Sequence, residues 1–167
     1  MNAFVFYSPT KVIFGKGVEN QVGREIKAWG GTKVLVHFGG GSVKRSGLLD
    51  RVEASLKEAG LDYVLLGGAV PNPRLGLVYE GIDLCRKEGI DFVLPVGGGS
   101  AIDSAKAIAI GAVYDGDVWD FYDGKAVPTE ALPTANILTL AATGSETSEH
   151  SVITKEEGGI KRGIGFP

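Results

Sequence analysis

Residues 91–110, DFVLPVGGGSAIDSAKAIAI, decide how this chain folds. The segment passes from a β-prone apolar run through Gly97, Gly98 and Gly99 into a run with the character of a helix. Three adjacent glycines lose more backbone entropy on ordering than any other tripeptide, so a fold that keeps them needs positive φ angles or a close neighbour there. A packed helix and a bound ligand are the two candidate neighbours.

The same order of strand, loop and helix recurs along the chain. Strands are predicted at 33–38, 62–69 and 91–96, and helices at 19–30, 48–60, 77–89 and 100–112. Strands that alternate with helices of this length indicate βαβ units. The sequence therefore predicts an α/β fold with a doubly wound, mostly parallel sheet.

The two ends of the chain carry further β-prone segments. Residues 4–6 and 12–14, FVF and VIF, flank the turn-like YSPT and predict an N-terminal β-hairpin. A long polar and aromatic connection occupies 114–134, and residues 135–154 then predict a strand, a turn and a second strand. The tail at 155–167 predicts a returning hairpin. We expect the 167 residues to form one domain, cut short at its C-terminal edge.

Composition indicates a globular protein of the reducing cytoplasm. The chain is 44% hydrophobic, with a mean hydropathy of +0.11, which provides for a sizeable core. The net charge of −3 argues against a nucleic-acid partner, and no apolar run approaches the roughly 20 residues that cross a bilayer. The single cysteine, Cys85, cannot form an intramolecular disulfide, and the sequence does not begin like a secretory leader. We expect a cytoplasmic protein without membrane contact.

Two GGGS loops come directly after predicted strands, at 39–42 and at 97–100. The carboxyl ends of parallel strands lie at one edge of a sheet, where ligands of open α/β folds bind. Bare backbone N–H groups at a helix start favour anions, so the loop at 97–100 predicts a cradle for a diphosphate. The structural alternative is a capping box, in which Ser100 caps the helix and Asp103 lies three residues later.

The loop at Gly39, Gly40 and Gly41 precedes a pair of cations, unlike the loop at 97–100. Ser42, Lys44 and Arg45 come next, where the adenosine ribose of a dinucleotide often lies, and no acidic residue stands at this strand end. A ribose 2′-hydroxyl typically meets Asp or Glu, whereas a 2′-phosphate needs cations and hydroxyl donors. The sequence therefore favours NADP(H) over NAD(H). The alternative is that the two cations mark a solvated helix start.

Two more polar loops are predicted at the same edge. Asn72 lies between two prolines after the strand at 62–69. The segment TLAATGSE, which comes after a further strand, offers Thr139, Thr143 and Ser145. Each loop alone is an ordinary turn, but four of them on one edge together indicate a binding site.

Several motifs, in this order and spacing, resemble the iron-containing (group III) alcohol dehydrogenases, in the branch of butanol dehydrogenases and NADPH-dependent aldehyde reductases. They are PTKVIFGKG, GGGSVKRSG, PNP, VGGGSAIDSAKAIAIGA, GDVWDF and LTLAATGSETSEHSVIT. The resemblance implies a Rossmann-like N-terminal domain that binds a nicotinamide dinucleotide. It also implies cofactor contacts from Gly39, Gly40, Gly41, Ser42, Asn72, Gly98, Gly99, Ser100, Asp103, Thr139, Leu140, Thr143, Ser145 and Lys161, to which the two glycine loops add Lys44 and Gly97.

The chain departs from the family at its end. Family members continue into a helical domain in which an aspartate and three histidines hold Fe²⁺ or Zn²⁺, whereas this sequence stops at Pro167. His37 is interpreted as a strand-end residue, and His150 with Glu146 and Glu149 as a polar turn. We assign no metal ligand and no catalytic residue in this chain.

The resemblance implies the cofactor-binding half of a metal-dependent, NAD(P)H-linked alcohol dehydrogenase or aldehyde reductase, which we expect to be inactive alone. Hydride then passes between the nicotinamide and a primary alcohol or aldehyde. This hypothesis implies a helical metal-domain partner or a homo-oligomer. The alternative is a non-catalytic nucleotide-binding or interaction module that pairs with another chain through an apolar face. A sibling enzyme, such as a glycerol dehydrogenase or a sugar-phosphate synthase, is the third hypothesis.

Overall fold

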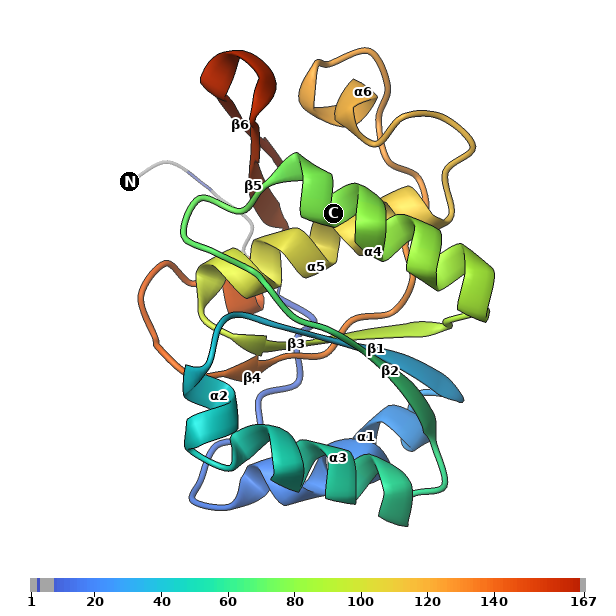
Figure 1. The fold of residues 1–167 in the computed structure, drawn as a ribbon, viewed down its shortest axis with the longest axis vertical. Coiled ribbons are helices and arrows are strands. Elements are labelled where there is room, and N and C mark those ends of the chain that lie inside the picture. Colours follow the sequence, from blue (N-terminus) through green and yellow to red (C-terminus); the bar gives the residue numbers. More distant parts are fainter. Residues whose placement is uncertain (1–2, 4–7, 166–167) are drawn as a thin grey trace.

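A four-stranded parallel sheet forms the middle of the protein, with helices on both of its faces (Figure 1). The computed structural model describes residue 3 and residues 8–165. The strands are β1 (Lys33–Phe38), β2 (Asp62–Leu66), β3 (Phe92–Gly97) and β4 (Ile137–Leu138), in the order β2-β1-β3-β4. This arrangement confirms the predicted α/β class with a parallel, Rossmann-like sheet.

Two helices pack on each face of the sheet. α1 (Val22–Ala28) and α3 (Leu48–Glu58) cover one face, and α4 (Leu75–Glu88) and α5 (Gly99–Ala112) cover the other. The shorter helical segments are η1 (Val18–Gln21), α2 (Ser42–Arg45), α6 (Trp119–Tyr122), η2 (Ser145–Thr147) and η3 (Glu157–Gly159). Within the described residues, no helix is long and apolar enough to cross a membrane.

Strand β1 is buried from both sides because it lies between the two helical layers. Val34 and Val36 belong to the core on the side of α1 and α3, whereas Leu35 belongs to the core on the side of α4 and α5. All three side chains are fully buried. A strand covered on both faces is typically a continuous apolar run, which is the pattern of the sequence at 33–38.

The order of the strands reverses beside β1. The chain passes from β1 to β2 through α2 and α3 on one face, and then crosses β1 through α4 on the other face to form β3. In open α/β sheets, ligands bind outside the carboxyl ends of the strands at such a reversal point. The loops after β1 and β3 are therefore where this fold would place a bound ligand.

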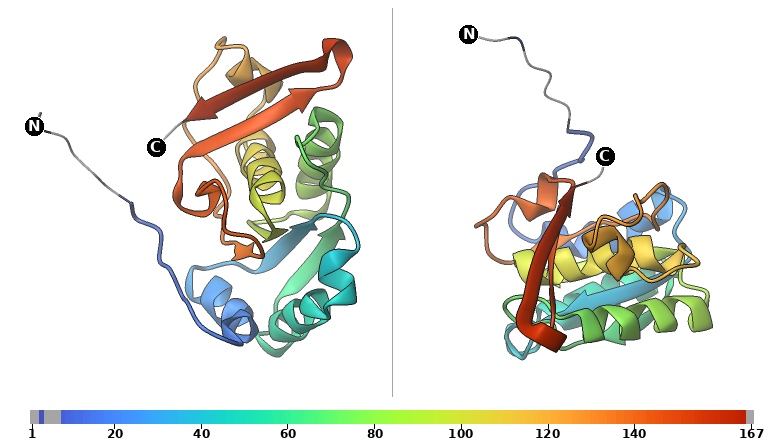
Figure 2. Two further views of the ribbon diagram at one scale, coloured as in Figure 1. Left: turned by 90° about the vertical axis from the view of Figure 1, so that its left-hand side faces the viewer. Right: turned by 90° about the horizontal axis from the view of Figure 1, so that it is seen from above.

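Beyond β4 the chain leaves the sheet and forms an antiparallel hairpin from β5 (His150–Lys155) and β6 (Ile160–Gly165). Figure 2 shows this hairpin lying over the layer of α4 and α5. Its strand β5 buries Ile153 completely in the core of that layer. The hairpin predicted at the C-terminal end is confirmed.

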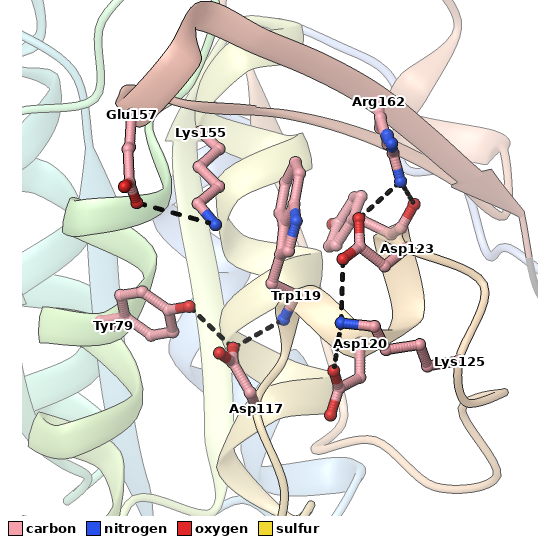
Figure 3. A network of polar contacts seen from close by, with 10 residues as sticks. Tyr79, Asp117, Trp119, Asp120, Asp123, Lys125, Lys155, Glu157 and Arg162 are labelled. Carbon is pink, nitrogen blue, oxygen red and sulfur yellow. Dashed lines mark hydrogen bonds and ion pairs between the residues drawn. The ribbon is translucent and has the colours of Figure 1, made fainter.

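The connection at 114–134 fastens this hairpin to the helical layer, as Figure 3 shows. The guanidinium of Arg162 in β6 donates to the carboxylate of Asp123, which comes directly after α6. The ammonium of Lys155 in β5 lies 5.9 Å from the centre of the Trp119 ring, within the range of a cation–π contact. One connection therefore contacts both strands of the hairpin, β5 through Trp119 and β6 through Asp123.

The predicted N-terminal hairpin differs from the structure. Residues 4–6, its first expected strand, lie outside the described residues. Residues 12–14, its second expected strand, have no regular secondary structure, and the Phe14 side chain is 98% exposed. A β-prone run becomes a strand only where a neighbouring strand pairs with it, and the described part of the chain records none beside residues 12–14.

His37 joins three elements through a fully buried imidazole. Its Nδ1 lies 3.0 Å from the carbonyl oxygen of Leu66 in β2, and its Nε2 lies 3.0 Å from Oγ of Ser104 in α5. Because a carbonyl oxygen only accepts, Nδ1 carries the proton and Nε2 accepts from the Ser104 hydroxyl. Burial lowers the pKa of His37 from 6.5 to about 4, while the bond to Leu66 opposes this shift.

The buried imidazole predicts a loss of stability as the pH falls. Above pH 6.5 the ring is neutral in both the folded and the unfolded chain; between 6.5 and about 4 only the unfolded chain takes up the proton. The free energy of unfolding therefore falls with pH across this window, by up to about 3 kcal/mol from this group. Urea unfolding at about pH 7.5 and about pH 4.5 measures the loss.

The matched variants separate His37 from the carboxylates that also titrate in this range. His37→Gln is expected to be less stable at neutral pH but to lose less stability on acidification than the unchanged chain. His150→Gln, at an exposed position, is the control and is expected to keep the full loss. An equal loss in all three proteins would show that His37 does not govern this part of the pH profile.

Candidate functional site

The two GGGS loops lie next to each other because β1 and β3 end at the same level. Phe38 of β1 pairs with Val96 of β3, so Gly39 and Gly97 are the next residues on neighbouring strands. α2 and the start of α5 then leave at this edge of the sheet (Figure 1). The predicted convergence of both loops is confirmed by the register of the strands.

The three glycines at 97–99 do not have positive φ angles. A Cβ atom on Gly97 would lie 2.8 Å from Cβ of Ala101, and one on Gly99 would lie 2.9 Å from Oγ1 of Thr143. A Cβ on Gly98 would find its nearest neighbour, Cβ of Leu140, at 3.9 Å. Close packing therefore requires glycine at Gly97, whereas a Cβ on Gly99 would only displace the hydroxyl of exposed Thr143 and a Cβ on Gly98 would make an ordinary contact with Leu140.

The capping box expected at the start of α5 is not formed. The helix begins at Gly99, its N-cap is Gly98 with φ −91° and ψ −170°, and no side chain caps it. Ser100 already lies inside the first turn, where its hydroxyl is past the capping position. The backbone N–H groups of Gly98, Gly99 and Ser100 make no hydrogen bond within the described part of the chain. The start of the helix thus presents unpaired donors beside Gly98, where no side chain covers them.

Asp103 does not contact the start of its own helix, as a capping box would require, but the segment that leads into β5. One carboxylate oxygen accepts a hydrogen bond of 2.5 Å from Oγ of Ser145, and the other accepts from the Val152 N–H at 3.2 Å. Ser145 is buried, and its hydroxyl is occupied by these internal contacts. The two residues were predicted to bind cofactor; in the structure they tie α5 to the segment that leads into β5.

The segment after β4 forms a wall beside the glycines of β3. The N–H of Thr139 donates to the carbonyl oxygen of Gly97 at 3.0 Å. Leu140, which is 67% exposed, approaches Gly98, and the hydroxyl of Thr143 approaches Gly99. Thr139, Leu140 and Thr143 therefore lie beside the glycine loop at 97–99.

The loop at Gly39, Gly40 and Gly41 is likewise open at its middle residue. A Cβ on Gly40 would meet no heavy atom within 4 Å, whereas one on Gly41 would lie 2.5 Å from a guanidinium nitrogen of Arg45. The ammonium of Lys44 lies 5.3 Å from the centre of the Phe38 ring. Across residues 8–165, no ion pair links either cation to a carboxylate. Two unneutralised cations therefore stand beside exposed Ser42.

Asn72 and Lys161, far apart in sequence, meet at the third loop. Asn72 has a φ of 58°, a left-handed conformation that Asn tolerates better than most residues. Its side-chain oxygen accepts a hydrogen bond of 2.8 Å from the Lys161 ammonium on β6. The hairpin thus reaches the edge of the sheet that carries the other predicted site residues.

One residue of the site was missed by the sequence reasoning. Lys106 donates to the carbonyl oxygens of Ser145, Ser148 and His150 at distances of 2.6 to 2.8 Å. It lies three residues after Asp103, on the same side of α5, and a single cation within the otherwise apolar run AKAIAI was the available signal.

Metal ligands do not gather at this edge. The described residues contain no group of three His, Cys, Asp or Glu side chains placed to hold a metal ion. Both ring nitrogens of His37 are bonded inside the core. The residues that the structure describes therefore do not fit the Fe²⁺ or Zn²⁺ that the family resemblance implies.

A polar hollow of about 350 Å³ lies elsewhere, between α1 and α3. It contains none of the predicted site residues and is lined by Asn20, Gln21, Arg24, Lys27, Ser55, Glu58 and Ala59. The glycine loops, by contrast, lie at the edge of the sheet, and their hydrogen-bond donors are backbone N–H groups.

Comparisons with known proteins agree with this geometry. The family model of iron-containing alcohol dehydrogenase matches residues 9–167. The probable NADH-dependent butanol dehydrogenase 2 of Bacillus subtilis is 54% identical over 157 residues, which are 94% of this chain and 40% of that protein. The NADPH-dependent aldehyde reductase YqhD of Escherichia coli is 38% identical over 166 residues, which are 97% of this chain and 42% of that protein.

A solved structure gives the same result. The crystal structure of NADH-dependent butanol dehydrogenase A from Thermotoga maritima has a TM-score of 0.98 and 46% identity, and the match covers 99% of this chain and 42% of that one. The chain belongs to the iron-containing alcohol dehydrogenases. It spans about two fifths of the length of these relatives, at 40% and 42%.

The glycines at 97 and 98 predict losses of stability of different size for the same substitution. Gly97→Ala places a methyl group 2.8 Å from Cβ of Ala101 and is expected to destabilise the chain by about 1–3 kcal/mol. Gly98→Ala makes only an ordinary contact with Leu140 at an allowed φ, and is expected to cost less than about 1 kcal/mol, because Ala is a poorer N-cap than Gly. Urea denaturation of both variants tests the contrast, which equal losses would contradict.

Proposed function

We propose that this member of the iron-containing alcohol dehydrogenases binds a nicotinamide dinucleotide, with the diphosphate on the backbone of Gly98, Gly99 and Ser100. The observation that carries the proposal is a set of N–H groups that make no hydrogen bond to any described residue, beside a glycine whose missing side chain leaves room for a close approach. Donors at a helix start attract anions because their partial positive charges are not neutralised within the helix. A diphosphate supplies the acceptors that these groups lack.

The remaining residues of the edge orient the dinucleotide. Thr139, Leu140 and Thr143 flank the diphosphate loop, and Leu140 is free to contact a ring because it is mostly exposed. Asn72 and Lys161 close the site on the side of β2, where a cationic side chain favours a phosphate or a ribose hydroxyl. When bound, the nicotinamide gives or accepts a hydride. Asp103 and Ser145 do not contact the dinucleotide in this proposal; their hydrogen bond holds the segment after Thr143 against α5.

The adenosine end of the dinucleotide lies in this proposal at the loop after β1. Gly40 leaves room for close approach, and Ser42 offers a hydroxyl donor. Lys44 and Arg45 offer charge that no carboxylate neutralises in the part of the chain described. A 2′-phosphate satisfies these groups better than a ribose hydroxyl, so we propose a preference for NADP(H) over NAD(H). The relatives carry both kinds of name, so the proposed preference rests on these residues alone.

The complete reaction in this proposal is the reduction of an aldehyde, or the oxidation of a primary alcohol, in the cytoplasm. The chain contributes cofactor binding and needs a metal-bearing partner domain, because its described residues supply no metal site. Binding without turnover is therefore the behaviour proposed for the 167 residues alone.

Gly98→Val tests the diphosphate cradle. The variant is expected to fold, because a Cβ at this position makes only an ordinary contact with exposed Leu140, but to lose dinucleotide binding, because the side chain occupies the proposed place of the phosphate. Calorimetric titration with NADPH measures binding, and thermal unfolding checks the fold. Ala54→Val, on the exposed face of α3, is the control for added bulk and is expected to bind like the unchanged chain. Full binding by folded Gly98→Val would contradict the proposal.

Lys44→Met tests the adenosine end. NADPH is expected to bind more tightly than NADH, and the substitution to remove about 1.5–3 kcal/mol of NADPH binding while NADH is unaffected. Lys57→Met, which removes an exposed lysine from α3, is the matched control for net charge. Equal affinity of the unchanged chain for the two dinucleotides would remove the preference while leaving the diphosphate site intact.

A further inference from the structure

The ammonium group of Lys106 is surrounded by the backbone of the segment it faces. It donates to the carbonyl oxygens of Ser145 at 2.6 Å, Ser148 at 2.7 Å and His150 at 2.8 Å, and it lies 3.2 Å from Oγ of Ser145. These partners span six residues, from the start of η2 to the first residue of β5. The segment therefore wraps around one cation.

The three short contacts use the whole donor capacity of the side chain. An ammonium group has three N–H donors and no acceptor, so no donor is left for a ligand. Charge-assisted bonds of this length are stronger than neutral ones. Burial lowers the pKa of Lys106, and the neighbouring carboxylates of Asp103 and Glu146 oppose that shift. Lys106 thus acts on the chain itself rather than on a bound molecule.

The three carbonyl oxygens converge because the cation lies between them. Without it, their partial negative charges would face one another at a partly buried position, with an unfavourable desolvation cost. Asp103, one helical turn earlier, holds the same segment through Ser145 and the Val152 N–H. α5 therefore fixes residues 145–152 with one anion and one cation spaced three residues apart.

The fixed segment carries one wall of the site. Thr143 lies just before it and approaches Gly99, and Lys161 lies on the hairpin after it. A shift of residues 145–150 would move the Thr143 hydroxyl away from the start of α5. The position of the segment that carries Thr143 thus depends on Lys106, which lies on α5 and not in that segment.

We propose that Lys106 is a positioning residue, an internal cation around which residues 145–150 fold and which thereby sets the affinity of the site for a nicotinamide dinucleotide. The affinity part rests on the proposed function; the folding of the segment does not. Three converging carbonyl oxygens match the three N–H donors of a primary ammonium ion. If the Lys106 side chain is removed by substitution, the space it leaves is therefore expected to bind a small primary ammonium ion.

Lys106→Ala tests the proposal by chemical rescue. The variant lacks the atoms of n-propylammonium, which is therefore the added ion that matches the missing part of the side chain. NADPH affinity is expected to fall by about tenfold or more in the variant, as for the loss of bonds to a charged group. Added n-propylammonium is expected to restore most of it. Tetramethylammonium at the same concentration has no N–H donor and is expected to restore nothing.

Hydrogen exchange provides a readout that does not need the dinucleotide. The N–H groups of Thr147 and Ser148 donate to Gly144 and Ser145 within the segment, and they are expected to lose protection in Lys106→Ala and regain it with n-propylammonium. Lys106→Met, which retains the apolar stem, replaces the alanine variant for the affinity and exchange measurements if that variant does not fold. Lys57→Met is the control for charge.

The outcomes are distinguishable. Unchanged protection and unchanged NADPH affinity in folded Lys106→Ala or Lys106→Met would overturn the inference. Equal effects of n-propylammonium and tetramethylammonium would also overturn it, because the ion would then act without donating. If the unchanged chain binds no dinucleotide, the proposed function fails and the affinity part with it. Hydrogen exchange then decides alone whether Lys106 organises the segment.

Discussion

The parallel pairing of β1 with β3 is the interaction on which the rest of the structure depends. Its register, from Val34 with Phe92 to Phe38 with Val96, makes both strands end at one level and places two glycine loops side by side. A slip of one residue would reverse which side chains enter each core and would also separate the loops. His37 lies within this pairing and bonds to both β2 and α5, so the buried imidazole links the central strand to the helix that carries the bare donors.

The start of helix α5 and its second turn have different structural roles. At its start, the N–H groups of residues 98–100 make no hydrogen bond to any described residue, and the close approach of Gly97 to Ala101 holds this backbone in place. Its second turn carries Asp103 and Lys106, which fix the opposite wall. At Gly98 a Cβ would make no close contact, so the same tripeptide combines tight packing at Gly97 with room for the proposed ligand at Gly98.

The sequence predicted the features that depend on local pattern. Apolar runs and glycine junctions indicated β1, β3 and the helices between them, because burial on both faces gives a strand a continuous apolar sequence. Features that depend on distant partners were not predicted. The run at 12–14 has strand-forming residues but no paired strand in the described structure, and Ser100 has the spacing of a cap although α5 starts before it. Lys106 was missed because a helical lysine is usually solvated, and only the fold brings three carbonyl oxygens to it.

The most direct test of the account tracks the backbone amides during titration with a nicotinamide dinucleotide, by two-dimensional ¹H–¹⁵N NMR. The account predicts that the resonances of Gly98, Gly99 and Ser100 shift most, with those of Gly40 and Gly41 shifting beside them, while residues of the hollow between α1 and α3 are unaffected. Shifts confined to that hollow, at Arg24 and its neighbours, or no shifts at all, would contradict it.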